Sequence, residues 1–142
     1  MTRKLLTLML MLICAMPTIA QKGLHVNELF EGHIISPERM VETQVRGKAV
    51  AKYGLTYFHS LRFKAKKNEA KSIEALILKD VSEESSLSVN RVGGLYWKIN
   101  VQLKPKGNIK RLICYKYDMP DVLIIFMEGP GAVPETLEKM LQ

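Results

Sequence analysis

The chain has 142 residues, 25% of them charged, and a formal net charge of +7. A chain of this length builds one hydrophobic core without disulfide support, which argues against a multidomain protein. The sequence also contains no internal repeat, low-complexity tract or interdomain linker.

Residues 1–20 have the pattern of a secretory signal peptide. A basic start precedes an apolar stretch over residues 5–15, and the segment ends in small residues at Ala20. Cleavage there leaves one α+β domain of residues 21–142. A retained membrane anchor is the first alternative, but the apolar stretch is shorter than the roughly 20 residues that a spanning helix needs. A lipoprotein start at Cys14 is the second, disfavoured because the preceding residue is not a small Gly or Ala.

Removal of the signal peptide changes the charge and the thiol content. Lys plus Arg falls from 21 to 19 while Asp plus Glu stays at 14, so the mature net charge is +5. Cys114 is then the only thiol, and no internal disulfide is possible. Its apolar neighbours Leu112 and Ile113 predict a buried, unreactive side chain. We expect no transmembrane span after cleavage.

The hydrophobic periodicity predicts three helices and six strands. In chain order we expect a short helix over residues 24–30, a half-buried strand over 41–46, a helical turn over 49–53, a strand in the second half of 55–65, a helix from an Asn68 cap to about Val81, strands over 85–92, 95–103, 109–117 and 122–127, and a helix over 134–141.

Alternation assigns side chains to faces in several of these strands. Residues 122–127 are apolar on both faces, which predicts an interior strand covered on both sides. We expect it to follow the 109–117 strand, with the 134–141 helix folding back over it. Gly93-Gly94 predicts a hairpin turn. The inward residues expected beside this turn are Leu87 and Val89 before it, and Leu95, Trp97, Ile99, Val101 and Leu103 after it.

Local hairpins and few crossovers indicate the α+β class. We expect a mainly antiparallel sheet of about five to six strands, with the helices packed on one face.

Several segments together resemble uncharacterised small exported proteins of Bacteroidetes-type bacteria. The resemblance rests on Leu29-Phe30 and on residues 41–48, 53–61, 93–96 and 127–129. The order of hairpin, apolar strand and amphipathic helix at the end is also similar to a second, more distant family of exported proteins without an assigned role. Both resemblances imply export from a Gram-negative cell and an α+β domain. Neither implies a catalytic residue.

No catalytic, cofactor or metal site is predicted, although two sets of residues were candidates. The spacing of His25, His33 and His59 matches no compact metal-ligand pattern. Asp118, Asp121 and Glu128 are carboxylates that a hydrolase could use in a cleft, but their Pro and Gly neighbours favour a role in turns.

The basic residues form the candidate binding site. If neighbouring strands present them on one face, they make a patch for an anionic ligand, against the simpler interpretation of a solvated sheet face. The patch consists of Arg62, Lys64, Lys98, Lys104, Lys110 and Lys116.

The function expected from these features is that of a non-enzymatic binding or interaction domain in the periplasm or associated with the outer membrane. The expected partner is an anionic glycan or an envelope protein, and nucleic acid is a poor partner for an exported chain. The alternatives are a hydrolase that uses the acidic residues and a structural subunit of an envelope complex.

Overall fold

The computed structural model describes residues 23–141, so the expected signal peptide lies outside the described residues. The elements in order are α3 (Asn27–Phe30), a 3₁₀ turn η1 (Pro37–Arg39), β1 (Val41–Arg46), α4 (Lys48–Ala51), β2 (Tyr57–Lys64), α5 (Lys67–Lys79), β3 (Ser86–Val92), β4 (Leu95–Gln102), β5 (Lys110–Asp118), β6 (Asp121–Gly129) and α6 (Pro134–Met140).

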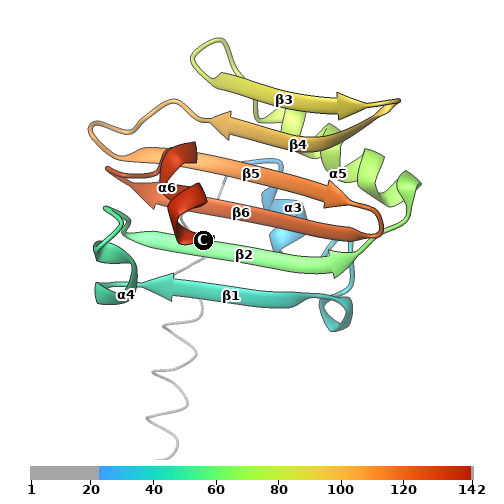
Figure 1. The fold of residues 1–142 in the computed structure, drawn as a ribbon, viewed down its shortest axis with the longest axis horizontal. Helices are drawn as coiled ribbons and strands as arrows, with labels where there is room; N and C mark the ends of the chain where they lie inside the picture. The colour runs from blue at the N-terminus through green and yellow to red at the C-terminus, as the bar shows by residue number, and fades with distance from the viewer. Residues whose placement is uncertain (1–22, 142) are drawn as a thin grey trace, which may run out of the picture.

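The strands form one open, antiparallel sheet in the order β1-β2-β6-β5-β4-β3 (Figure 1). After β2 the chain crosses through α5 to the far edge of the sheet and returns by three successive hairpins. The last of these places β6 between β5 and β2. The predicted antiparallel sheet of five to six strands is therefore confirmed.

β6 is buried on both faces, as an apolar run without alternation requires. Val122, Ile124 and Phe126 lie on one face, where they are at most 2% exposed and pack with residues of α3 and α5. We call this the inner face. Ile125 and Met127 lie on the opposite face, which we call the α6 face, and pack with residues of α4 and α6.

The expectation that the helices pack on one face is not confirmed. Figure 1 shows α6 in front of the sheet and both α3 and α5 behind it. Leu137 of α6 joins the core cluster of the α6 face, whereas Ile73 and Ile77 of α5 join that of the inner face. Both faces carry helices because β6 has apolar side chains on both faces, and each face must be covered.

The edge strand β3 is more exposed than its alternation predicted. Leu87 and Val89, expected to point into the core, are 44% and 38% exposed. Among the described residues, the core cluster of the inner face reaches β4 at Ile99 and Val101 and includes none from β3. Alternation identifies the two faces of a strand, but burial also depends on whether a helix covers it.

A β-bulge overturns the predicted inward position of Trp97. Asn90 pairs with Lys98 but Arg91 pairs with Tyr96, so Trp97 is an extra residue in β4. Trp97 is 46% exposed. Tyr96 instead packs against the inner core, and its N–H donates to the buried carboxylate of Glu74 over 2.8 Å.

The predicted cap of the long helix is also wrong. α5 begins at Lys67, so Asn68 lies inside the helix and Lys66 occupies the cap position. The side chain of Glu69 accepts the N–H of Lys66 at 3.0 Å. A carboxylate three residues into the helix therefore satisfies the backbone at its start.

Candidate functional site

α6 covers only part of its face of the sheet. Its core cluster includes Leu112, Cys114, Ile125 and Met127, whereas Leu123 lies at the margin and is half-buried. Beyond Leu123, toward the hairpin that joins β5 to β6, this face is free of helices in the described part of the chain (Figure 1).

The strand register brings basic residues together around Leu123. Arg62 of β2 pairs with Leu123, Leu123 pairs with Lys116 of β5, and Lys116 pairs with Lys98 of β4. Paired residues in neighbouring strands point to the same face, so these four side chains form one row across the sheet. Asp118 and Asp121, which pair with each other, lie beside it at the hairpin. We call the four residues of the row and these two carboxylates the open surface.

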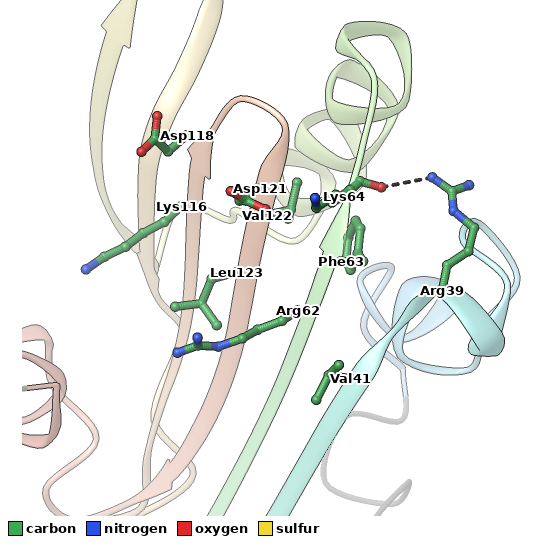
Figure 2. A pocket seen from close by; sticks show the side chains of 10 residues that line it. All are labelled: Arg39, Val41, Arg62, Phe63, Lys64, Lys116, Asp118, Asp121, Val122 and Leu123. Carbon is green, nitrogen blue, oxygen red and sulfur yellow. Dashed lines mark hydrogen bonds between the residues drawn. The ribbon is translucent and has the colours of Figure 1, made fainter.

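The open surface is hollowed above β2, β6 and β5. Figure 2 shows Arg62 reaching toward Leu123 from one side, with Lys116 on the other. The hollow has a volume of about 710 Å³, and its lining includes both basic residues, Leu123 and the two carboxylates. A small apolar floor between cations suits an amphipathic anion.

The cations of the open surface are largely free of internal ion pairs. Within residues 23–141, Arg62 and Lys116 take part in none of the ion pairs. Lys98 Nζ lies 3.9 Å from the carboxylate of Glu138 on α6. The charges of Arg62 and Lys116 are therefore available to a ligand.

The six basic residues proposed from the sequence do not form one cluster. Arg62, Lys98 and Lys116 share the row, and Lys64 lies next to them, paired in register with Asp121. Two of the six lie elsewhere. Lys110 is at the opposite end of β5 beside Gly129, and Lys104 forms an ion pair of 2.8 Å with Glu84.

Sequence reasoning missed Leu123, Trp97 and Arg39 as parts of this region. Leu123 belongs to an apolar run that seemed wholly buried, and only the short reach of α6 exposes it. Trp97 lines a second hollow with Lys98 and Lys116. No local signal marks either residue, because a helix position and a bulge determine their exposure.

Arg39 lines the hollow but is already paired. Its guanidinium donates to both carboxylate oxygens of Glu69, over 2.9 and 3.1 Å, and to the carbonyl of Lys64 over 2.9 Å. The hydrogen bonds from Arg39 and from the N–H of Lys66 lower the pKa of Glu69 from its usual 4.5 to about 2. The pair joins η1 to the start of α5 and fixes one rim of the hollow.

The three candidate carboxylates do not come together. Asp121 and Glu128 are seven residues apart in one extended strand, a separation of roughly 23 Å. Successive side chains of a strand point to alternate faces, so Asp121 and Glu128, which are an odd number of positions apart, point to opposite faces of the sheet. Only Asp118 and Asp121 adjoin, at the hairpin where the sequence favoured turn roles.

The histidines are dispersed as well. His59 is buried beneath Phe30, with ring centroids 4.5 Å apart, and its Nδ1 lies 3.0 Å from the Tyr57 hydroxyl. Burial lowers the pKa of His59, against the opposing effect of Glu42. His33 instead lies on the surface, 2.9 Å from a Glu28 carboxylate oxygen.

Cys114 is buried, as predicted. Burial raises the pKa of its thiol to about 11, despite the nearby charges of Lys116 and Lys98. The thiol is therefore protonated at neutral pH and is a poor nucleophile.

Residues 23–141 contain no group of three or more His, Cys, Asp or Glu residues placed to hold a metal ion. None of their helices has the length and apolar character to cross a membrane.

Residues 13–141 match the model of a family of unknown function, DUF6108, and the chain belongs to that family. Comparison with curated proteins and with solved structures gave no match. The match covers all of the described residues 23–141 and assigns no activity, ligand or partner to them.

The Arg39–Glu69 pair makes stability depend on pH in a defined range. Because the folded-state pKa of Glu69 is lowered, its stabilising contribution is complete above pH 4.5 and is lost as the pH falls toward about 2. We expect Glu69→Gln to lower the free energy of unfolding at pH 7 and to flatten its fall between those pH values. Urea unfolding measured at a series of pH values tests this.

The matched control is Glu83→Gln, at an exposed residue outside the ion pairs of the described chain. Equal pH profiles for the two variants would contradict the assignment.

Proposed function

For this member of a family of unknown function, we propose a non-enzymatic binding domain of the bacterial envelope that holds an acidic ligand on its open surface. One observation carries the proposal: Arg62 and Lys116 flank the half-buried Leu123 in a hollow of about 710 Å³. Neither cation has an internal ion-pair partner among residues 23–141.

The electrostatics of the row favour an anion. Lys98 and Lys116 are directly opposite each other in neighbouring strands, an arrangement that destabilises a sheet. The carboxylate of Glu138 relieves this only in part at 3.9 Å. A ligand carboxylate, sulfate or phosphate between the two ammonium groups would remove the repulsion and form charge-assisted hydrogen bonds.

The affinity of one such anion is expected to be modest. An exposed ion pair contributes roughly 0.2–1 kcal/mol, and salt screens it. A polymer with repeated charges gains affinity through its many contacts, so a polyanion suits the row better than a single small ion. The binding should weaken steeply as salt is added.

The placement in the envelope rests on the sequence. Residues 1–20 combine a basic start, an apolar stretch and small residues before the expected cleavage site after Ala20. The resemblance to exported proteins of Bacteroidetes-type bacteria supports the same location.

Export predicts a processed N-terminus. The protein purified from the envelope fraction of its own cells should begin at Gln21 when its intact mass and N-terminal peptide are measured. A chain that retains Met1 or Thr2 and fractionates with the cytoplasm would reject this part of the proposal.

Charge reversal in the row tests the binding function. We expect Arg62→Glu with Lys116→Glu to reduce binding to immobilised poly-L-glutamate and to polygalacturonate at least tenfold at low salt, a ratio of about 1.4 kcal/mol. The matched control is Lys104→Glu with Lys110→Glu, which changes the net charge equally but lies outside the open surface. The two double variants should differ because only Arg62 and Lys116 flank Leu123.

Two outcomes would overturn the proposal. One is equal loss in both double variants, which would mean that net charge alone drives adsorption. The other is an absence of retention of the wild type at low salt. Circular dichroism and thermal unfolding of each variant establish that it is folded, and all four residues are at least partly exposed, so folding should be preserved.

A further inference from the structure

Beyond the open surface, the same face of the sheet continues along β4 to the edge strand β3. A second hollow of about 460 Å³ is lined by Trp97, Lys98, Lys116 and Asp118, so it shares Lys116 and Asp118 with the first. The bulge in β4 brings Trp97 there, with 46% of its surface exposed. Cations and an accessible aromatic ring therefore line adjoining hollows.

A strip of neutral polar groups extends the α6 face along the same two strands. Ser88 pairs with Asn100 and Ser86 with Gln102 in register. These four residues line a third hollow of about 340 Å³. Their hydroxyl and amide groups both donate and accept hydrogen bonds.

One group in this strip lacks a partner. Asn100 is only 7% exposed, and its Oδ1 accepts no hydrogen bond within residues 23–141. Gln102 differs, since its amide donates to the carbonyl of Ala132 over 2.6 Å. The Oδ1 atom is itself buried, and a buried acceptor without a donor is costly, so a turn of the Asn100 side chain that brings Oδ1 to a ligand hydroxyl would stabilise the complex.

We infer that the acidic ligand is a polysaccharide that carries carboxylate groups. This inference rests on the proposed function. One sugar ring of the polysaccharide packs on Trp97. The carboxylates of the polysaccharide pair with Arg62, Lys116 and Lys98, and its hydroxyls face the strip that contains Asn100. From β2 to β4 the row crosses three strand spacings, roughly 14 Å, which is long enough for several linked sugars.

The lining favours a glycan over an acidic peptide. Charge alone serves both ligands equally well. A solvent-exposed aromatic ring can pack against the apolar face of a sugar ring, and a row of hydroxyl and amide groups can hydrogen-bond to the many sugar hydroxyls. An extended peptide would instead use a sheet edge, and the strip lies on the face of β3 and β4.

Trp97 is the only tryptophan in the chain, so its fluorescence reports directly on this surface. We expect polygalacturonate, alginate or hyaluronan to shift the emission of the full mature protein to shorter wavelength, because the ring leaves water. Poly-L-glutamate of matched charge should bind through Arg62 and Lys116 with little shift.

A variant separates the glycan inference from the electrostatic one. Trp97→Ala should weaken binding to the responsive polysaccharide about tenfold and change binding to poly-L-glutamate less than twofold. Leu87→Ala is the control and should leave binding unchanged, since Leu87 is 44% exposed but lies on the opposite face of β3 from Ser86 and Ser88.

Each outcome decides between the two proposals. If poly-L-glutamate and all three polysaccharides bind equally, without a shift in emission and without loss in Trp97→Ala, the glycan inference is wrong and the acidic-ligand function stands. If none of the four polymers binds at low salt, both are wrong. Tighter binding to a polysaccharide, lost in Trp97→Ala and kept in its apolar control variant, supports both.

Discussion

The burial of β6 on both faces is the constraint on which the rest of the structure depends. Its nine residues extend roughly 30 Å and must be covered by two layers. On the inner face α5, with 13 residues, spans roughly 20 Å and α3 adds to the cover. On the other face α6 has 7 residues and spans roughly 10 Å. The unequal lengths leave Leu123 at the boundary between a packed core and water.

This boundary explains the composition of the open surface. An uncovered sheet face must be polar to remain soluble, and long basic side chains can shield an apolar neighbour with their stems while their charges stay in water. Figure 2 shows Arg62 reaching toward Leu123 in that way, with Lys116 on the other side. The inner face also contributes at a distance, because the buried Glu74 accepts the N–H of Tyr96 next to the bulge that exposes Trp97. Core packing and the exposure of Trp97 therefore depend on neighbouring residues of β4.

Local pattern was sufficient for the main helices and strands, because helical spacing and strand alternation have fixed periods. The neighbours were not predictable in the same way. Arg62 and Lys116 come together only because β6 inserts between β2 and β5, a pairing between distant segments. Trp97 was assigned to the wrong side because a bulge adds one residue to β4, and the carboxylate of Glu74, which accepts the N–H of the preceding Tyr96, is far away in sequence. The wrong cap at Asn68 has a local origin instead, because the carboxylate of Glu69 accepts the N–H of Lys66 and the helix begins one residue before Asn68.

The central claim is that the half of the sheet face beyond α6, and no other surface, holds the ligand. The most direct measurement is an amide chemical-shift titration of the labelled mature domain with a short oligogalacturonate. We expect the perturbed amides to gather around Arg62, Trp97, Lys98, Lys116 and Leu123, and the amides of α3 and α5 on the inner face to be unaffected. Perturbations centred on α5, on the outer edge of β1, or on the Lys104 and Lys110 end of β5 would contradict it.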